Sequence, residues 1–285
     1  MTRVTLVHGR VRTEEKMLLE AAQQLGIDVR PVHDDTLVLD LDGGGLGGDA
    51  VMERSVSATR GLYVARAARA AGIPCFNSAD TIAACMDKAE TSWRLRGAGV
   101  PTPETRVAFD RESALTAIAQ LGYPAVLKPT QGSWARLVAR VDNATQAEQL
   151  IEHREMLPNP LQHVMYVQAY VDKSQRGGMH GDVRAYVIGE ETVAAVWRRS
   201  PHWVTNTARG GVTEPCEITD DLNDMCIRAA ASVGGGILAI DAMPVGDSYT
   251  VHEVNHSMEF RNSAKTSGVD IASLMLQHVV KEARR

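Results

Sequence analysis

The C-terminal third of the chain contains the stretch Val251-His252-Glu253-Val254-Asn255, preceded by the apolar run Ile237-Leu238-Ala239-Ile240-Asp241-Ala242-Met243. Both runs are typical of β-strands, and Gly246-Asp247-Ser248 between them is typical of a hairpin turn. If the chain folds back about the middle of this turn, Asp241 lies directly opposite Glu253. This pairing predicts two acidic side chains facing each other within one sheet.

Asp241, Glu253 and Asn255 would share one face of the hairpin, because side chains alternate along a strand. Two carboxylates that face each other repel, and they destabilise the sheet unless a cation lies between them. Two carboxylates and an amide oxygen suit Mg²⁺, with phosphate oxygens and water completing the octahedron. The alternative is that both acids are ordinary solvated residues. The residue chemistry favours the metal site, provided that the register is correct.

The composition is that of an ordinary globular enzyme with two or three structural units. The chain has 285 residues, of which 44% are hydrophobic and 23% charged. A net charge of −5 argues against general nucleic-acid binding. No apolar run is long enough to span a bilayer and no signal peptide is apparent, which predicts a cytoplasmic protein. Reduced thiols are expected at the four cysteines, which form no Cys-x-x-Cys pair: Cys75, Cys85, Cys216 and Cys226.

The first 77 residues alternate strand-like and helix-like segments, which predicts a parallel sheet covered by helices. The expected strands are Val4–Val7, Asp28–His33, Thr36–Leu41, Ala50–Glu53 and Ile73–Phe76. The expected helices are Glu14–Leu25 and Ala58–Ala71. The glycine-rich run at 43–48 lacks the strand-then-helix setting of a dinucleotide-binding motif, so we interpret it as a surface loop.

Four polar residues follow the strand Ala50–Glu53, where the chain passes into a helix: Arg54, Ser55, Ser57 and Arg60. In open α/β sheets, ligands bind beyond the carboxyl ends of the strands, so these residues could hold a carboxylate. Ordinary helix capping by serine, with solvated arginines beside it, explains the same pattern equally well.

The middle of the chain offers a lysine and a small-residue loop in succession. A helical region over 80–97 is expected to break near Asp87, and the proline-rich connector at 100–103 suggests a domain boundary. Further on, the apolar strand Ala125–Leu127 ends at Lys128. The loop Thr130-Gln131-Gly132-Ser133-Trp134 comes directly after it, and its backbone amides could surround a phosphate.

A second hairpin is expected around the turn Gly189-Glu190, because the residues on both sides alternate between polar and apolar. We expect one of its faces to carry Asp182, Arg184 and Arg199. The loop at 202–211 is polar, contains Trp203 and ends in glycines, which favours a ligand-binding loop over a linker. Helices are expected over 220–233 and 271–285.

Taken together, these motifs resemble the ATP-grasp superfamily, in the branch that contains RimK-type carboxylate–amine ligases. The resemblance covers nearly the whole chain and is carried by the runs at 53–57, 87–88, 126–129, 132–134, 206–211 and 253–262. It implies an α/β (α+β) ATP-grasp fold in three parts. These are a Rossmann-like pre-ATP-grasp domain (1–90), a central lid subdomain (91–170) and a C-terminal antiparallel-sheet catalytic subdomain (171–285).

The resemblance also implies roles for individual residues. ATP would be bound by Lys88, Lys128, Gly132, Ser133, Gln168, Ala169, Tyr170, Val171, Arg199 and Asn206. Two Mg²⁺ ions, which Mn²⁺ can replace, would be held by Asp241, Glu253 and Asn255. Catalytic residues around the transferred phosphate would be Arg184, Arg199, Lys128 and Asn206. Substrates would be bound by Arg54, Ser55, Ser57, Arg60, Asn206, Thr207, Ala208, Arg209, Glu259 and Asn262.

The implied reaction is ATP-dependent amide formation through an acyl phosphate. The run Asn206-Thr207-Ala208 is similar to that of relatives which use α-aminoadipate in lysine biosynthesis, where Gly-Thr-Phe accompanies glutamate. The implied partner is a small acidic LysW-like carrier protein ending in glutamate, and a homo-oligomer (dimer or tetramer) is expected, with no membrane or nucleic-acid partner. Glutamate or another acceptor, glutamate addition to a protein tail, or a nucleotide-binding module without catalysis are the alternatives.

Two positions depart from the family pattern. Ala135 stands where family members usually have glycine, which predicts a stiffer phosphate loop. Ala169 stands where glutamate is expected, so a side-chain contact to the nucleotide there is in doubt. Backbone recognition of adenine is compatible with both changes.

Overall fold

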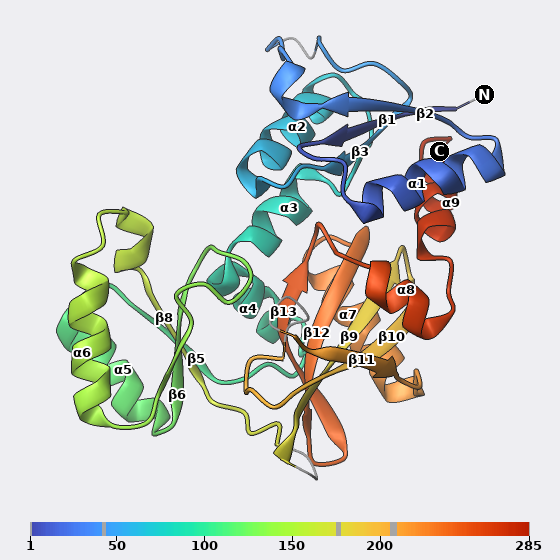
Figure 1. Ribbon diagram of the computed structural model, residues 1–285. Helices are drawn as coiled ribbons and strands as arrows, with labels where there is room; N and C mark the ends of the chain where they lie inside the picture. The colour runs from blue at the N-terminus through green and yellow to red at the C-terminus, as the bar shows by residue number, and fades with distance from the viewer. Residues whose placement is uncertain (1, 42–43, 175–177, 206–209, 285) are drawn as a thin grey trace.

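The computed structural model describes residues 2–41, 44–174, 178–205 and 210–284 (Figure 1). Three β-sheets organise the chain, and each lies within one of the three expected sequence ranges. The mixed α/β architecture predicted from the sequence is confirmed, while the boundaries between the three parts stay a prediction. Among the helices of the described ranges, none combines the length and the apolarity needed to cross a membrane.

The N-terminal sheet is parallel, as predicted, with the strand order β2-β1-β3-β4. Its strands are β1 (Arg3–His8), β2 (Asp28–His33), β3 (Ala50–Arg54) and β4 (Cys75–Phe76), and its helices are α1 (Thr13–Leu25) and α2 (Ala58–Ala70). The expected strand over 36–41 is wrong. Asp34–Thr36 forms the short 3₁₀-helix η1, and the residues after it join no strand ladder in the described structure. Leu37 and Leu39 pack against the core beside the sheet, while Leu41 is 99% exposed.

Two helices, α3 (Ala79–Met86) and α4 (Lys88–Gly97), connect this sheet to the rest of the chain. The predicted break at Asp87 is confirmed. The carboxylate of Asp87 accepts hydrogen bonds from the backbone N–H groups of Ala89 and Glu90, so it caps the second helix. This cap fixes Lys88 at the first position of α4.

The central sheet has the order β5-β8-β6-β7 and is covered by two helices. Its elements are β5 (Thr105–Ala108), α5 (Arg111–Leu121), β6 (Ala125–Pro129), β7 (Ala139–Val141), α6 (Ala144–Glu155), the 3₁₀-helix η2 (Pro160–His163) and β8 (Met165–Ala169). Leu127 and Val167 pack against the helices, in one core with Ile118 and Ile151. Because strand side chains alternate, Lys128 and Gln168 point to the opposite face.

The C-terminal sheet is antiparallel with the order β11-β10-β9-β12-β13. Its strands are β9 (His180–Ile188), β10 (Glu191–Ser200), β11 (Val212–Pro215), β12 (Ile237–Val245) and β13 (Ser248–Asn255). Helix α7 (Asp220–Ser232) packs on one face through Leu222 and Cys226. The other face contributes Tyr186 to a core that includes Phe260 and residues of the C-terminal helices α8 (Arg261–Ser267) and α9 (Ile271–Glu282).

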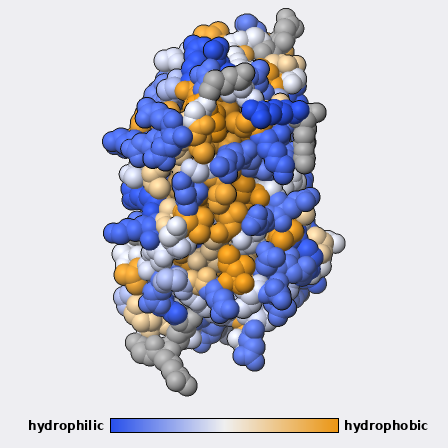
Figure 2. All heavy atoms as spheres, turned by 90° about the vertical axis from the view of Figure 1, so that its right-hand side faces the viewer, coloured by the Kyte–Doolittle hydropathy of each residue, from blue (hydrophilic) through white to orange (hydrophobic). Residues whose placement is uncertain are grey.

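The last helix joins the first and third parts of the chain. Leu276 of α9 and Leu18 of α1 belong to the same core as Tyr186 of β9, and the two helices lie side by side in Figure 1. The face on this side of the molecule carries hydrophobic residues in its centre between hydrophilic margins (Figure 2). The N-terminal sheet and the C-terminal sheet share an apolar core, to which α9 contributes Leu276.

In the hairpin β12–β13, Asp241 pairs with Glu253, which confirms the predicted pair. The turn is nevertheless shorter than predicted, since Val245 pairs with Ser248 across two residues instead of three. A one-residue bulge at His252 restores the pairing further along the strands. Without the bulge, Asp241 would face His252 and Glu253 would point to the opposite side.

In the hairpin β9–β10, the expected position of Arg199 is wrong. Arg198 pairs with Asp182 and shares its face, and Arg199 points to the other side. The reason is again a bulge, here at Val193, which shifts the later pairing by one residue. A regular ladder continued from the turn would have placed Trp197 opposite Asp182 and Arg199 on the same face as Asp182, as the sequence suggested.

Candidate active site

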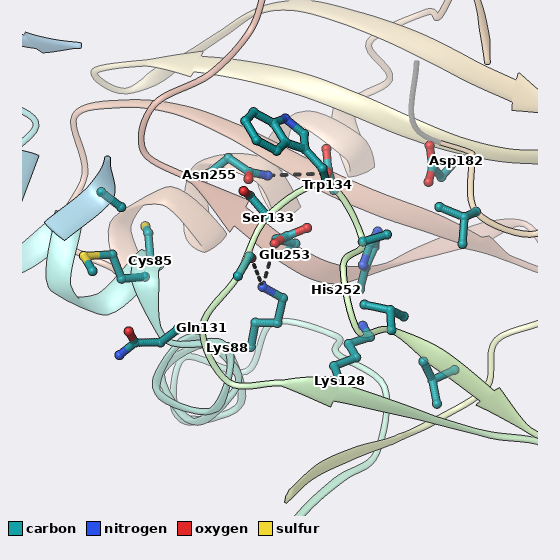
Figure 3. A pocket seen from close by; sticks show the side chains of 18 of the residues that line it. Cys85, Lys88, Lys128, Gln131, Ser133, Trp134, Asp182, His252, Glu253 and Asn255 are labelled. Carbon is teal, nitrogen blue, oxygen red and sulfur yellow. Dashed lines mark hydrogen bonds and ion pairs between the residues drawn. The ribbon is translucent and has the colours of Figure 1, made fainter. Parts of the chain in front are cut away.

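A cavity of about 630 Å³ lies between the central and C-terminal sheets and reaches the start of α2 (Figure 3). The N-terminal sheet contributes Ser55 and Arg12, the central sheet Lys128, and the C-terminal sheet Glu253. This volume is in the range of pockets that bind small molecules. All three parts of the chain thus meet at one site.

One wall of the cavity carries two lysines. Lys128 is only 9% exposed, and its Nζ donates to Oε1 of Gln168 over 2.7 Å. Burial lowers the pKa of Lys128 to about 8. Lys88 donates to the carbonyl oxygen of Gly132 over 2.8 Å and lies 3.2 Å from Oε1 of Glu253. Lys88 therefore contacts the glycine-containing loop at 130–134, and Lys128 lies on the strand that leads into this loop.

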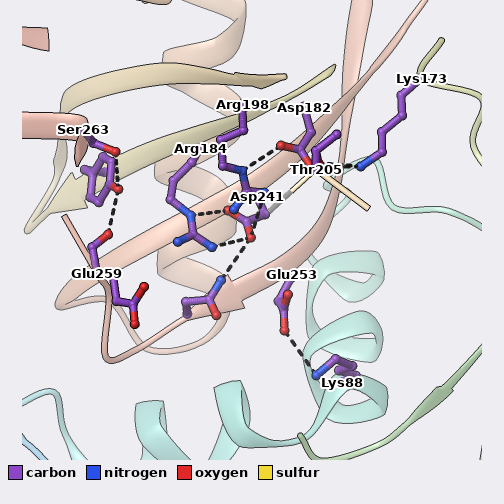
Figure 4. Close-up of polar contacts among 12 residues, drawn as sticks. Lys88, Lys173, Asp182, Arg184, Arg198, Thr205, Asp241, Glu253, Glu259 and Ser263 are labelled. Carbon is purple, nitrogen blue, oxygen red and sulfur yellow. Dashed lines mark hydrogen bonds and ion pairs between the residues drawn. The ribbon is translucent and has the colours of Figure 1, made fainter. Parts of the chain in front are cut away.

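The opposite wall carries a buried ion network in which carboxylates and guanidinium groups alternate (Figure 4). Arg184 donates to both carboxylate oxygens of Asp241, each over 2.7 Å. Arg198 lies 3.2 Å from Asp241 and donates to Asp182 over 2.7 Å. Burial raises the pKa of Asp241, but Arg184 and Arg198 outweigh it and hold that pKa at about 2. Asp241 is therefore ionised at neutral pH.

Asp182 anchors the other end of this network. It accepts a hydrogen bond from Nζ of Lys173 over 2.9 Å and another from the hydroxyl of Thr205. Burial opposes ionisation of Asp182, but Arg198 and Lys173 lower its pKa well below the ordinary range. Because Thr205 belongs to the loop after β10, this contact holds the start of that loop against the cavity.

The predicted metal ligands form a set of oxygen donors that fits a hard cation. Asp241, Glu253 and Asn255 all line the cavity, and the amide of Asn255 lies 3.4 Å from Asp241. The carboxylate of Glu253 is the more accessible, at 29% exposure, whereas that of Asp241 is 2% exposed and already paired with two arginines. Two carboxylates and an amide oxygen match the ligand preference of Mg²⁺.

The loop after β6 has an unusual backbone. Trp134 and Ala135 have φ values of 57° and 52°, in the left-handed region that non-glycine residues rarely adopt, and Leu137 has 57°. The glycine usual at the place of Ala135 would accommodate this conformation without a Cβ penalty. Ser133 and Trp134 both line the cavity (Figure 3).

Most of the residues that the sequence singled out line this cavity. They are Ser55, Lys88, Lys128, Gly132, Ser133, Gln168, Ala169, Tyr170, Val171, Arg184, Asp241, Glu253, Asn255 and Glu259. Asn262 lines a second cavity of about 20 Å³, which shares Arg184, Arg198 and Glu259 with the first. The predicted Asn206, Thr207, Ala208 and Arg209 lie outside the described residues.

Four predicted residues lie elsewhere. Arg199 donates to Glu214 of β11 and stacks on Trp197, outside the cavity. Ser57 caps α2, and Arg60 is an exposed residue paired with Asp34 and Asp35, as the alternative interpretation of this segment expected. The guanidinium of Arg54 is buried against Glu15 and the carbonyl oxygen of Met258, so it connects the N-terminal sheet to the segment after β13.

Several residues of the site were not predicted, notably Arg198, Lys173 and His252. Arg198 was missed because of the bulge in β10. Lys173 follows the hinge at 168–171, and its charge suggested a surface residue, although its side chain is 8% exposed. Burial lowers the pKa of His252 to about 4, so this pocket-lining imidazole is neutral. The sequence motifs pointed to Glu253 and Asp241, and none of them singled out His252.

Comparison with known proteins agrees with this geometry. Residues 85–279 match the RimK-like ATP-grasp domain model, and residues 4–84 match the LysX preATP-grasp domain model. The chain is 31% identical to the alpha-aminoadipate–LysW ligase LysX of Saccharolobus solfataricus (96% of this chain, 99% of the relative). It is 33% identical to the glutamate–LysW ligase ArgX of Sulfolobus acidocaldarius (97% and 98%).

A solved structure shows the same fold. The RimK domain ATP-grasp protein of Sphaerobacter thermophilus superposes with a TM-score of 0.80 at 27% identity, and the match covers 98% of this chain and 99% of that one. The resemblance inferred from the motifs is thus confirmed along nearly the full length. The chain belongs to the RimK-like ATP-grasp family and is an ATP-dependent carboxylate–amine ligase.

Proposed function

We propose that the protein joins the α-amino group of α-aminoadipate to the side-chain carboxylate of a C-terminal glutamate on a small acidic carrier protein of the LysW type. The observation that carries this proposal is one cavity in which Arg184 and Arg198 bind Asp241, while Lys88 contacts Glu253, the strand partner of Asp241. Lys128 and Asn255 line the same cavity. Such a site is suited to transferring a phosphoryl group to a carboxylate.

The reaction has two steps. The carboxylate attacks the γ-phosphorus of ATP, the bond to the β–γ bridging oxygen breaks, and an acyl phosphate and ADP form. The amine then attacks the acyl carbon, phosphate leaves, and the amine loses a proton as the amide forms. The protein's contribution is positioning and charge neutralisation, which is what phosphoryl transfer requires.

Individual side chains fit these steps. Lys88 and Lys128 would bind the nucleotide phosphates, since Lys88 contacts the loop at 130–134 and Lys128 lines the same cavity from the strand before that loop. Arg184 and Arg198 would neutralise charge on the phosphoryl group as it moves. Asp241, Glu253 and Asn255 would hold Mg²⁺, which supplies electrophilic activation of the phosphate oxygens when bound. The backbone at 168–171 would bind adenine.

The acceptor is the least constrained part of the proposal. The run Asn206-Thr207-Ala208 supports α-aminoadipate, because relatives with this run use it. Glutamate is the second candidate, because ArgX, whose name gives glutamate, is as similar to the chain as LysX is. Both acceptors are acidic amino acids, so the arginine-rich end of the cavity is compatible with either.

A substrate panel tests the proposal. The purified protein, Mg²⁺ and ATP are combined with an acidic carrier peptide ending in glutamate and with α-aminoadipate, glutamate or ornithine. We expect ADP release and an amide conjugate, seen by mass spectrometry, with α-aminoadipate above the others. Conjugation of glutamate alone would favour the second candidate, and ADP release without a carrier dependence would contradict the proposed partner.

Two variants test the assignments within the site. Lys128→Ala and Glu253→Gln are each expected to abolish ADP release, because one removes a phosphate contact and the other a metal ligand. Circular dichroism should show an unchanged fold in both. Wild-type turnover by both variants would refute these roles. Loss in Glu253→Gln that is rescued by excess Mn²⁺ would support the metal assignment.

A further inference from the structure

Arg154 occupies a position where the sequence pattern calls for an apolar residue. It lies in the last turn of α6, on the same stripe as Ala147 and Ile151, which pack in the core of the central sheet. Arg154 as a whole is only 4% exposed. It forms no salt bridge with a carboxylate in the described part of the chain. A buried guanidinium without an acid is costly, so it calls for an explanation.

The guanidinium bridges two segments that are far apart in the sequence. Nη2 donates to the carbonyl oxygen of Leu137 over 2.9 Å, at the end of the loop after β6. Nη1 donates to Oε1 of Gln162 over 2.9 Å, in the 3₁₀-helix η2. Both bonds go to neutral acceptors, so the fork geometry of arginine is used to connect backbone segments.

Both connected segments are walls of the cavity. The loop contributes Gln131 to Ala135 and Val138 to the lining, and η2 contributes Leu161 and Gln162. The carbonyl that Arg154 holds belongs to Leu137, one of three non-glycine residues of this loop with a positive φ. An L-residue disfavours that conformation, so the loop needs an external contact to keep it.

We propose that Arg154 is a positioning residue that holds the loop at 130–138 in the shape that receives the nucleotide's β- and γ-phosphates. The arginine does not line the cavity and acts through the loop. The inference rests on the proposed function, because it assumes that this loop binds phosphate. It predicts a role confined to the phosphate end of the nucleotide, since the adenine hinge at 168–171 is held by β8 instead.

The test compares ADP with AMP, because AMP lacks the phosphate that the loop would contact. Affinities are measured by isothermal titration calorimetry for the wild type, Arg154→Met and Arg154→Lys. We expect Arg154→Met to weaken ADP binding about tenfold, the loss typical of one charge-assisted hydrogen bond, and to change AMP binding less than about twofold. Arg154→Lys should be intermediate, because an ammonium cannot bridge both acceptors in the same geometry.

Arg111→Met is the matched control. Arg111 is an exposed arginine of α5. It lies 3.9 Å from Glu152 and 3.8 Å from Glu155, two residues of α6, the helix that also carries Arg154. Its loss should leave both affinities unchanged. In steady-state assays, Arg154→Met should raise KM for ATP by a similar factor with little change in kcat, which a general loss of folded protein would not do.

Two results would overturn the positioning role. The first is ADP binding by Arg154→Met that equals that of the wild type. The second is an equal loss for ADP and AMP, which would mean that the arginine supports the central sheet as a whole. If Arg154→Met does not fold, wild-type ADP binding by Arg154→Lys would also contradict the bridge. Failure of the wild type to bind any adenine nucleotide would instead refute the proposed function.

Discussion

Two hairpins of one sheet, β9–β10 and β12–β13, carry most of the charged groups on one wall of the cavity, and each contains one bulge. In β12–β13 the bulge at His252 compensates for a short turn, so Asp241 meets Glu253. In β9–β10 the bulge at Val193 exchanges the two faces of the later part of β10. Arg198, and not Arg199, therefore shares a face with Asp182. The same device preserved one prediction from the sequence and reversed the other.

The difference shows that hairpin register is set by features other than residue alternation. A shift of one residue exchanges the two faces of a strand, and a bulge makes such a shift in the middle of an otherwise regular ladder. Bulges in general raise the local twist and are common beside active sites. The bulge at His252 directly precedes Glu253, whereas the bulge at Val193 lies close to the turn of its hairpin. The register of each hairpin can be tested by substituting a residue on one face of a strand and, separately, a residue on the other face.

The largest difference in the rate of ADP release is expected between two single variants, Arg198→Gln and Arg199→Gln. Arg198→Gln should lower the rate of ADP release by about a thousandfold, because one charge-neutralising donor of a phosphoryl-transfer site is lost. It also leaves Asp182 with one cation fewer. Arg199→Gln should stay within about threefold, because Arg199 contacts Glu214 outside the cavity. ADP release is measured by a coupled assay.

An inactive Arg199→Gln beside an active Arg198→Gln would mean that the bulge at Val193 is absent and that the ladder is regular. Equal losses in the two variants would point to damage of the whole strand. In that case, thermal unfolding curves of both proteins would show the same destabilisation.

The second test separates Asp241 from Glu253, which face each other but have different surroundings. Asp241→Asn should lower the free energy of unfolding by about 3 kcal/mol, because two buried guanidinium groups lose their shared anion. Glu253→Gln should cost less than about 1 kcal/mol, because the Glu253 side chain is 29% exposed and the change also removes its repulsion with the facing Asp241. Both variants should lose activity. Urea unfolding at neutral pH measures the difference, and equal costs would contradict it.

Acid titration gives a smaller effect on the same pair. The pKa of Asp241 is held at about 2, below its ordinary value of 3.8, so its stabilising contribution is complete above about pH 4. That contribution is lost as the pH falls through about 2. Over this range the stability difference between wild type and Asp241→Asn should shrink by about 2 kcal/mol. Urea unfolding at pH 5 and pH 2.5 measures it.

Glu214→Gln is the control for this titration, because it removes an exposed partner of Arg199. Its difference from the wild type should stay within about 0.5 kcal/mol at both pH values. A gap between wild type and Asp241→Asn that is constant down to pH 2.5 would show that Asp241 does not owe its charge to the two arginines.

These tests also mark what the sequence could reveal. Lys128 was predicted because a lysine at the end of a buried strand is unusual, and Glu253 because a hairpin folded about Asp247 brings it opposite Asp241. Both signals are local. Arg198 depended on a bulge, and Arg154 resembled part of an amphipathic stripe, although it contacts residues 17 and 8 positions away. Such contacts follow from packing of distant segments, which residue patterns do not encode.

The smallest effect concerns the two turns, and it asks whether turns or bulges set the register. Gly189 and Gly246 both have positive φ, of 66° and 59°, at the first position of a two-residue turn, as type II′ turns require. Gly246→Ala should cost about 1 kcal/mol of stability, because its Cβ meets no atom within 4 Å and only the backbone is disfavoured. Gly189→Ala should cost more, because its Cβ would lie 3.0 Å from Cε1 of His278.

Both alanine variants should keep wild-type ADP release if the bulges and the buried ion network fix the register. Asp241 and Glu253 would then stay paired even when the turn between their strands is strained. If Gly246→Ala abolished ADP release at an unfolding cost of only about 1 kcal/mol, the turn would control the pairing. A slip of one residue would in that case have moved Glu253 to the outer face.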